Sequence, residues 1–403
     1  MRVILLNQYY PPAEAPTATL LGDVGRMLAG QGVDVIVIAS DRDYSDPSRR
    51  FARRERLDGV DVRRVRTSGF GRGGSVGRLV DYVTFLMGAS GRLLAAGRAD
   101  WIVALTTPPL LAVLARLLGG LRGARLLYWV MDVYPDLAIE LGILRRGSGT
   151  GRLFGALAGW VLRSSDCVVA IGESMAEHLR AAGARDVRVV HNWIDGDIVR
   201  PLAVAGHPLR AAMGWQDKFV VLYSGNLGLA HDFETLLGAA SRLGASDPDV
   251  RFVFAGAGAR QLTLRREVDR RGLANVEFRP WVPHARLGES LTSADLHVVT
   301  LKEGVEGLLV PSKIYGILAA GRPTLFIGPA RGEIPAILAA GRCGYRVAVG
   351  DVAGVVNAIE AYRHDAGRLK REGAAARELF EREFERRVAT ARFGALLGFE
   401  TTS

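Results

Sequence analysis

The sequence has few groups that could form a metal-bound or disulfide-linked site. Its 403 residues include two cysteines, Cys167 and Cys343, which lie far apart in apolar runs without metal-ligand spacing. No G-x-G-x-x-G follows the first strand-like run, and the chain contains no Walker loop. We therefore expect buried free thiols, no metal site, and no dinucleotide site after the first strand.

Long apolar runs are also scarce. The first residues, MRVILLNQYYPP, read as a strand and not as an apolar leader, so we expect a cytoplasmic protein. The stretch 102–121 is apolar apart from Arg116, but TTPP interrupts it and GG ends it. A strand, a loop and a helix fit this pattern better than a transmembrane span.

Acidic residues are outnumbered, because 42 Asp and Glu stand against 52 Lys and Arg, which gives a net charge of +10. Arginines gather between residues 49 and 66, and the apolar segment 79–96 follows. No helix-turn-helix, zinc-finger or RNA-binding signature accompanies them. We therefore expect an anionic membrane surface as partner and no nucleic acid; the alternative is a solvated basic face.

Short apolar runs alternate with helical patterns along the whole chain, which predicts parallel sheets covered on both faces. The strand candidates are 2–6, 34–39, 60–65, 101–105, 125–132, 167–172, 187–192, 219–225, 251–258, 276–282, 294–301, 322–329 and 345–351. We expect two doubly wound α/β domains that face each other. Their ranges are 1–200 and 218–385, with a linker at 201–217 and a last helix, 386–403, that crosses back to the first domain.

Ligands of doubly wound domains bind beyond the carboxyl ends of the strands, so the loops there are the candidate sites. In the first domain, Asp132 ends an apolar strand and Tyr134 follows it. A carboxylate there can bind hydroxyls or accept a proton, or it can cap the next helix. Asn192 ends the last strand beside His191, which is either a base or a hydrogen-bonded structural residue.

The second domain has glycine-rich loops after its first two strands. Gly225 and Gly228 let backbone N–H groups approach a ligand, and we expect the following helix to direct its positive end at that loop. Gly256 occupies the corresponding place after the next strand. Trp281 and Val282 follow a third strand and suit a flat base. These loops predict a phosphate site beside a base site.

A lysine at the start of an apolar helical pattern is the least expected feature. Pro311 begins this pattern, and Ser312 and Lys313 occupy its first turn, where a cation opposes the helix dipole. A bound diphosphate would reverse that penalty. Glu333, at a later strand end, either accepts sugar or ribose hydroxyls or is an ordinary helix charge. We expect a nucleotide diphosphate in the second domain and a second substrate against the first.

Seven short motifs follow one another in order: NQYYPP, TTPPLL, DVYPDLAIELG, VVHNWID, YSGNLG with ETLL behind it, FRPWVP, and VPSKIYGILAAGRP with GEI behind it. Together they resemble glycosyltransferase family 4, and within it the branch that builds bacterial O-antigen, colanic-acid and capsule-type polysaccharides. The resemblance covers essentially the whole chain. It implies a GT-B fold, with two facing Rossmann-like domains and the nucleotide site in the cleft between them.

The resemblance also implies an activity, which is retaining transfer from a nucleotide-sugar, such as a UDP-N-acetylhexosamine, to a lipid-linked or glycan acceptor at the inner membrane face. Such enzymes need no metal or cofactor, because protein dipoles and cations stabilise the leaving diphosphate. The implied catalytic residues are Asp132, Lys313 and Glu333. The implied donor contacts are Gly225, Asn226, Gly228, Gly256, Trp281, Val282, Ser312, Lys313 and Glu333, and the implied acceptor side comprises Tyr10, Asp132, Tyr134 and Asn192.

Three positions depart from the family pattern. Many members carry two glutamates before the A-x-G-x-P turn, where this chain has Leu308 and Gly316, so another residue, such as Glu303 or Glu306, would have to bind the ribose. Met131 stands where many members have histidine. Two alternatives to transfer stay open: a UDP-sugar 2-epimerase, which has a similar fold, and a nucleotide-sugar-binding scaffold that lost its activity with the two glutamates.

Overall fold

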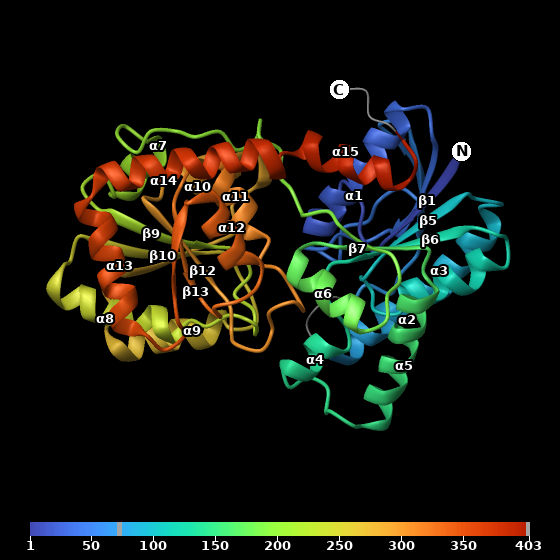
Figure 1. The fold of residues 1–403 in the computed structure, drawn as a ribbon, viewed down its shortest axis with the longest axis horizontal. Helices are drawn as coiled ribbons and strands as arrows, with labels where there is room; N and C mark the ends of the chain where they lie inside the picture. Colours follow the sequence, from blue (N-terminus) through green and yellow to red (C-terminus); the bar gives the residue numbers. More distant parts are fainter. Residues whose placement is uncertain (71–74, 400–403) are drawn as a thin grey trace. The chain divides into compact units, whose positions relative to one another are not determined.

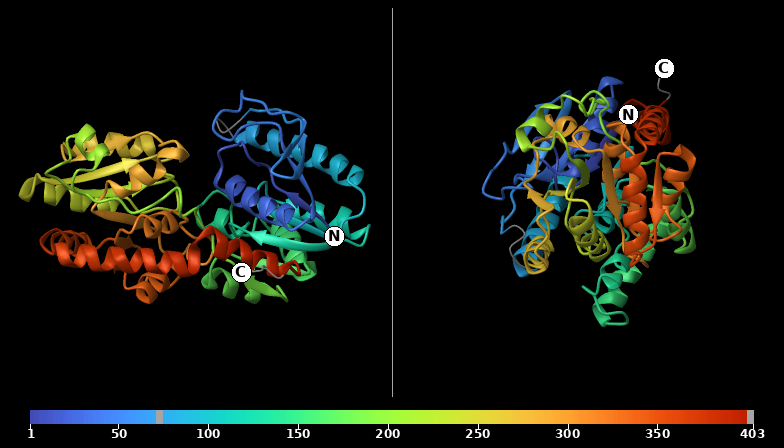
Figure 2. Two further views of the ribbon diagram at one scale, coloured as in Figure 1. Left: turned by 90° about the horizontal axis from the view of Figure 1, so that it is seen from above. Right: turned by 90° about the vertical axis from the view of Figure 1, so that its left-hand side faces the viewer.

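The computed structural model describes residues 1–70 and 75–399, which form two compact units. The first unit comprises residues 1–191 and the described residues from Ala389 onward, and the second comprises Asn192–Val388. Each unit is built on a largely parallel sheet with helices on both faces (Figures 1 and 2). The predicted class, two doubly wound α/β domains, is confirmed.

The first unit contains an eight-stranded sheet in the order β3-β4-β2-β1-β5-β6-β7-β8, parallel except for the β3–β4 pair. Its strands are β1 (Arg2–Leu6), β2 (Asp34–Ser40), β3 (Arg54–Leu57), β4 (Val60–Val65), β5 (Trp101–Leu105), β6 (Arg125–Val130), β7 (Cys167–Ala170) and β8 (Val187–Val189). Its helices are α1 (Pro16–Gly30), α2 (Ser75–Ala95), α3 (Leu111–Gly120), α4 (Asp136–Glu140), α5 (Gly149–Ser164) and α6 (Glu173–Ala181).

Alternate residues of the central strand β1 serve the two faces of this sheet, because successive strand residues point to opposite sides. Ile4 and Leu6 join Phe85 of α2 and the buried residues of α3 in one core. Leu5 points the other way, toward Gly25 of α1. The near-continuous apolar runs seen in the sequence therefore reflect strands that are covered on both sides.

The second unit contains a six-stranded parallel sheet in the order β11-β10-β9-β12-β13-β14. Its strands are β9 (Phe219–Ser224), β10 (Val250–Ala255), β11 (Val276–Arg279), β12 (Leu296–Thr300), β13 (Thr324–Ile327) and β14 (Gly344–Val347). Its helices are α7 (Pro208–Met213), α8 (Glu234–Ser246), α9 (Gln261–Arg271), α10 (Leu287–Thr292), α11 (Lys313–Ala319), α12 (Glu333–Gly341), α13 (Val352–His364) and α14 (Ala366–Leu379). The chain order reverses between β9 and β12, and this switch point is where such sheets bind ligands.

The first strand of the second unit also divides its side chains between two cores. Val221 and Tyr223 pack with α8, α9 and α13, whereas Val220 and Leu222 pack with Trp215 beside α7. Both faces of this sheet are thus covered by packed side chains. A ligand can therefore reach the sheet only at the ends of its strands. The loops at the carboxyl ends are therefore free to form a site.

One strand was not predicted. The thirteen expected strands all occur in order, but β3, with the sequence RERL, pairs antiparallel to β4 and was missed. Its residues alternate between exposed and half-buried, so it lacks an apolar run. Arg64 of β4 is fully buried and donates to Glu55 of β3, so part of the arginine run holds this sheet edge together.

The structure differs from the expected linker at 201–217. This segment contains α7 and packs within the second unit, where His207, Arg210 and Trp215 are buried. Arg210 donates to Asp295 at 2.8 Å, which fastens the segment to the start of β12. The chain returns to the first unit at Ala389, within helix α15 (Arg386–Leu396).

Residues 102–121 form most of β5, a loop and α3 with the turn that follows it, as predicted. Among the helices that the structure describes, none combines the length and the hydropathy needed to cross a membrane. Cys167 and Cys343 are both buried free thiols, which confirms that expectation.

Candidate functional site

Three loops of the second unit are joined at the carboxyl edge of its sheet. The Gly225 amide donates to the Ala255 carbonyl at 2.9 Å, and the Gly256 amide donates to the Arg279 carbonyl at 3.0 Å. The Leu227 amide donates to the Ala257 carbonyl at 2.9 Å. The loops after β9, β10 and β11 therefore form one connected surface beside the switch point.

Glycines make this close contact between loops possible. Gly225 and Gly256 have φ values of 142° and 137°, which side chains rarely adopt. A Cβ at Gly256 would lie 2.2 Å from the Gly225 carbonyl oxygen, and one at Gly258 would lie 2.4 Å from the Leu227 carbonyl oxygen. Gly258 was not predicted, although it is the second glycine of the AGAG run. These glycines let one loop pack on another.

Lys313 reaches this surface from the start of α11. Its Nζ lies 3.7 Å from the centroid of the Tyr223 ring and donates to the Tyr223 hydroxyl, which donates to the Asn226 carbonyl at 2.8 Å. A Cβ at Gly225 would lie 3.0 Å from Lys313 Cε, so the glycine makes room for the lysine. The predicted neighbours Gly225, Asn226 and Lys313 do lie together.

In the part of the chain that the structure describes, no carboxylate balances the charge of Lys313. Burial lowers the pKa of its amine well below the usual value. Within residues 1–70 and 75–399, no ion pair involves Lys313. An anion bound at Nζ would supply the missing countercharge and raise that pKa again.

His231 is a neighbour that sequence reasoning missed. Its ring Nδ1 lies 2.6 Å from the Thr300 carbonyl and donates to it, since a carbonyl can only accept. Burial, together with the Lys313 charge, lowers the pKa of His231 to about 3. The imidazole therefore stays neutral and adds no second charge beside Lys313. Its position soon after YSGNLG was the only signal for it in the sequence.

The helix after the YSGNLG loop was expected to direct its positive end at that loop. Helix α8 begins at Glu234, several residues after Gly228, and Asp232 accepts from the Thr235 amide at 3.2 Å. Asp232 thus satisfies one amide of the first turn of α8, and the direction of the helix dipole toward the loop stays a prediction. Lys313 brings a cation to the same loop, since its Nζ donates to the Tyr223 hydroxyl.

The remaining predicted donor residues lie on neighbouring loops of the same unit. Trp281 is 57% exposed and Val282 half-buried after β11, and Ser312 is exposed before α11. Glu333 begins α12 and is buried. Burial and the Glu333 charge raise the pKa of Tyr315, so these two side chains influence each other electrostatically.

The two positions of the missing glutamates are filled by apolar contacts. Gly316 is buried in α11, and a Cβ there would lie 3.0 Å from Leu291 Cδ1. Leu308 is also buried. Glu306 is the nearest carboxylate in sequence, and its Oε2 is buried without a hydrogen-bond partner in the described part of the chain. A Cβ at Gly332 would lie 3.3 Å from Glu306 Cβ, which places Glu306 beside the start of α12.

In the first unit, Asp132 and Tyr134 lie just beyond β6, as predicted. Burial raises the pKa of Asp132 to about 6, so this carboxyl can exchange a proton near neutral pH. Burial and the Asp132 charge also raise the pKa of the Tyr134 hydroxyl. Tyr134 lines a small cavity of about 20 Å³ together with Thr106 and Phe154.

The other two acceptor-side residues lie elsewhere. Tyr10 is only 3% exposed, and a Cβ at Gly25 would lie 2.8 Å from its hydroxyl, so Tyr10 is packed beneath α1. Asn192 belongs to the second unit. Tyr10 does lie in the loop after β1, as its motif indicated. The motif gave no information on the direction of its side chain.

Buried polar atoms at the switch point of the first unit were missed. The side-chain oxygens of Asn7 and Gln8, after β1, and of Thr106, after β5, are buried without a partner in the described residues. The backbone N–H of Gln8 donates to the Thr107 carbonyl at 3.0 Å, and this hydrogen bond joins the two loops. These oxygens can bind hydroxyl groups, and the motifs NQYYPP and TTPP contain them.

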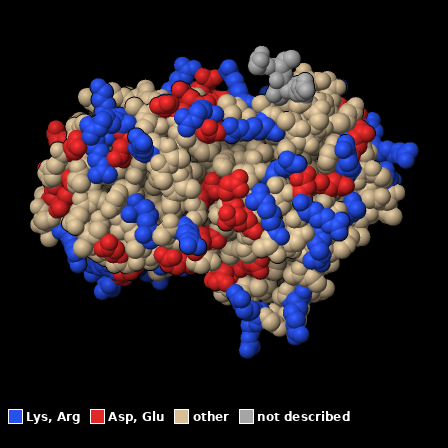
Figure 3. Space-filling view, in the orientation of Figure 1, with Lys and Arg blue, Asp and Glu red and all other residues tan. Residues whose placement is uncertain are grey.

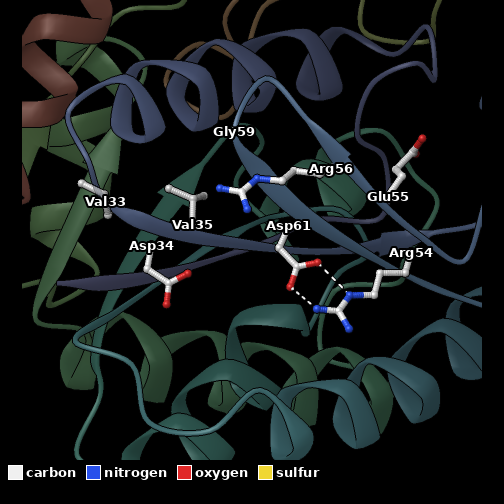
Figure 4. A pocket seen from close by; sticks show the side chains of 8 residues that line it. All are labelled: Val33, Asp34, Val35, Arg54, Glu55, Arg56, Gly59 and Asp61. Carbon is white, nitrogen blue, oxygen red and sulfur yellow. Dashed lines mark hydrogen bonds and ion pairs between the residues drawn. The ribbon is translucent and has the colours of Figure 1, made fainter.

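A larger hollow of about 370 Å³ lies away from these groups (Figure 4). The start of β2, strand β3 and the start of β4 form its walls. Arg54 and Asp61 form an ion pair at this hollow. None of the predicted site residues lines it. The hollow is therefore separate from the strand-end sites.

Both units match known protein families. Residues 17–193 match the model described as a glycosyl transferase 4-like domain, and residues 218–365 match glycosyl transferases group 1. The chain is 30% identical over 246 residues to WbjE of Pseudomonas aeruginosa, a probable glycosyltransferase, covering 60% of this chain and 61% of WbjE. It is 27% identical over 351 residues to WcaI of Escherichia coli K12, a putative colanic acid biosynthesis glycosyl transferase, covering 83% and 85%.

A solved structure shares the fold over the full length. HepE of Anabaena, crystallised in complex with UDP, has a TM-score of 0.74 and 16% identity, covering 99% of this chain and 100% of HepE. At this identity the likeness concerns the fold alone.

Proposed function

Because the chain belongs to the glycosyltransferases that combine a 4-like domain with a group 1 domain, we propose that it transfers a sugar from a nucleotide-sugar to a glycan or lipid-linked acceptor during synthesis of a cell-surface polysaccharide. Its fold is GT-B, as the sequence resemblance implied. The named relatives favour transfer over the epimerase and scaffold alternatives.

Lys313 is the observation that carries this proposal. Lys313 is half-buried, has no carboxylate partner among the residues that the structure describes, and lies beside two glycine loops at a switch point, which suits a diphosphate. Charge develops on the leaving diphosphate during sugar transfer, and a fixed cation stabilises it without a metal. Trp281 would contact the base, and Glu333 the donor sugar. UDP is the nucleotide bound by HepE, which supports a UDP-sugar donor here.

Asp132 would act on the acceptor in the first unit. A carboxyl with a pKa of about 6 accepts and releases protons near neutral pH, so it can bind and orient an attacking hydroxyl. We propose that the departing phosphate helps to deprotonate that hydroxyl on the same face of the sugar, which retains the anomeric configuration.

A panel of nucleotides tests the donor class. We expect UDP and UDP-sugars to raise the melting temperature, because a ligand at about 100 times its Kd stabilises the folded state by about 2.7 kcal/mol. GDP- and dTDP-sugars should have smaller effects. Incubation of a stabilising UDP-sugar without acceptor should leave the sugar configuration unchanged. An epimerised product would contradict the proposal in favour of the epimerase.

Asp132→Asn should change the pH dependence of stability. The pKa of Asp132 is raised from 3.8 to about 6 in the folded state, so its contribution is fully present below pH 3.8 and is lost as the pH rises through 6. The variant should therefore be more stable than the parent at pH 8, by at most about 3 kcal/mol, and not at pH 3.5. Denaturant unfolding at both pH values measures this difference.

Asp217→Asn is the matched control, because Asp217 is exposed. The free energy of unfolding of Asp217→Asn should differ from that of the parent by the same small amount at pH 8 and at pH 3.5. If Asp132 contacts the acceptor, the rate of sugar transfer by Asp132→Asn should fall even when the nucleotide-sugar is saturating. Equal stability of the Asp132 variant and the parent at pH 8 would show that burial does not raise this pKa.

A further inference from the structure

Glu306 has a buried carboxylate oxygen, Oε2, without a hydrogen-bond partner in the part of the chain that the structure describes. An ionised carboxylate can only accept, and a buried acceptor without a donor costs folding free energy. Folded proteins satisfy most groups of this kind, so an exception beside a strand end points to a ligand that brings its own donor. A sugar hydroxyl is such a donor.

The loop that carries Glu306 follows β12 and is fixed at both ends beside the loop after β9. At its start, the backbone N–H of Lys302 donates to the Ala230 carbonyl at 2.9 Å. At its end, Lys313 donates to the Tyr223 hydroxyl. Glu306 therefore belongs to a loop whose two ends both contact the loop that is proposed to hold the diphosphate.

The middle of this loop contacts the next strand end. A Cβ at Gly332 would lie 3.3 Å from Glu306 Cβ, and Gly332 directly precedes the buried Glu333 at the start of α12. The loops after β12 and β13 thus bring two carboxylates to one region of the sheet edge. Glu333 is the residue proposed to contact the donor sugar, and Glu306 adds a second acceptor beside it.

The strand order places Glu306 at the sugar end of a bound nucleotide-sugar. Trp281, the proposed base contact, follows the edge strand β11, and Gly225 and Lys313 follow the central strands β9 and β12. In the same direction the next strand is β13, whose loop leads to Glu333. A nucleotide that lies along this edge from base to diphosphate therefore brings its sugar to the loops after β12 and β13.

The cations of these two loops do not neutralise the pair of carboxylates. Burial, Lys313 and Lys302 lower the pKa of His231, so the Lys302 charge acts on the loop after β9. Arg331 is exposed, and water screens an exposed charge. Where Figure 1 shows the second unit, the space-filling view shows basic and acidic side chains interspersed (Figure 3). Selection by charge at this site must therefore come from its buried groups.

We propose that Glu306 accepts a hydrogen bond from a hydroxyl of the transferred sugar, and that it thereby selects a neutral donor over a uronic acid donor. A hydroxyl can donate to Oε2, whereas an ionised carboxylate has no hydrogen to donate. A uronate group would also lie within one sugar ring of Glu306, where like charges in a buried site repel each other. This inference rests on the proposed function, because it requires a nucleotide-sugar at this site.

Calorimetry with UDP-glucose and UDP-glucuronate tests the selection without any acceptor. The two donors differ in one group, a hydroxymethyl in the first and a carboxylate in the second. We expect the parent to bind UDP-glucuronate about tenfold or more weakly than UDP-glucose, because like charges at a binding site disfavour association. Glu306→Gln keeps the shape of the side chain and removes its charge, so this ratio should fall to about threefold or less. Its affinity for UDP alone should equal that of the parent.

Glu303→Gln is the matched control, because Glu303 lies on the same loop and is exposed. It should keep the parent's preference for UDP-glucose. A second comparison, of UDP with 2′-deoxy-UDP, reports on the ribose, and Glu306→Gln should leave that ratio unchanged. A change in this ratio, with the preference for UDP-glucose intact, would assign Glu306 to the ribose and overturn the proposal.

Two other results would also overturn the proposal. The first is a parent chain that binds UDP and then shows equal affinity for the two donors. The second is a preference for UDP-glucose that survives Glu306→Gln. Both results leave the proposed function standing, because UDP still binds. A parent chain that does not bind UDP would instead overturn the proposed function, and this inference with it.

Discussion

Lys313→Met is expected to weaken UDP binding by about 1.5–3 kcal/mol, or roughly tenfold to more than a hundredfold. Methionine keeps an apolar stem over the Tyr223 ring and removes the charge that a diphosphate would contact. Isothermal titration calorimetry measures the loss directly. Lys370→Met is the matched control, because Lys370 is exposed on α14 and should leave UDP affinity unchanged.

Stability should move in the opposite direction. Burial lowers the pKa of Lys313, so keeping the amine charged at neutral pH costs folding free energy. The unliganded Lys313→Met protein should therefore be at least as stable as the parent at pH 7, although it binds UDP more weakly. A variant that loses stability and keeps its UDP affinity would show that Lys313 only supports Tyr223 and the YSGNLG loop.

Proton uptake gives an independent check on the same residue. A bound diphosphate should raise the pKa of Lys313 toward its usual value, so binding near that lowered pKa takes up a fraction of a proton. Calorimetry in two buffers with different ionisation enthalpies detects this uptake. It should disappear in Lys313→Met and persist in Lys370→Met.

The grouping of Lys313 with Gly225 could be predicted because both follow strands of one parallel sheet. Loops at the carboxyl ends of neighbouring strands meet at one edge, whatever the side chains between them. Tyr223 could not be assigned in the same way. It lies inside the apolar run FVVLYS, and its contact with Lys313 exists only because β9 and β12 are adjacent.

Predictions that depended on side-chain direction or on finding an edge strand were less successful. Tyr10 follows β1 as expected, but its ring turns into the core beneath α1. Helix α8 was expected to direct its positive end at the glycine loop; it begins several residues later, and Asp232 accepts from the Thr235 amide of its first turn. The strand β3 was missed because an edge strand exposes one side and needs no apolar run. Local composition does not determine these features, since packing partners from distant segments decide them.

Gly256→Ala is expected to damage both the fold of the second unit and its ligand site. The new Cβ would lie 2.2 Å from the Gly225 carbonyl oxygen, and φ is 137°, a value that alanine rarely adopts. Because this contact is with backbone, one of the two loops must move. We expect a loss of at least about 2–3 kcal/mol in the free energy of unfolding, of which backbone strain alone accounts for about 1–3 kcal/mol.

Gly272→Ala is the control that distinguishes backbone strain from a steric clash of the new Cβ. Gly272 also has a positive φ, 64°, at the end of α9, but a Cβ there meets nothing within 4 Å. It should cost only about 1 kcal/mol and leave UDP affinity unchanged. Gly256→Ala should lose UDP affinity even in the fraction that stays folded, because the Gly225 amide donates to Ala255, directly before the substituted residue. The two substitutions could instead have equal effects on stability and on UDP affinity. That result would show that the loops after β9 and β10 can move apart at little cost, and that their close packing does not shape the diphosphate site.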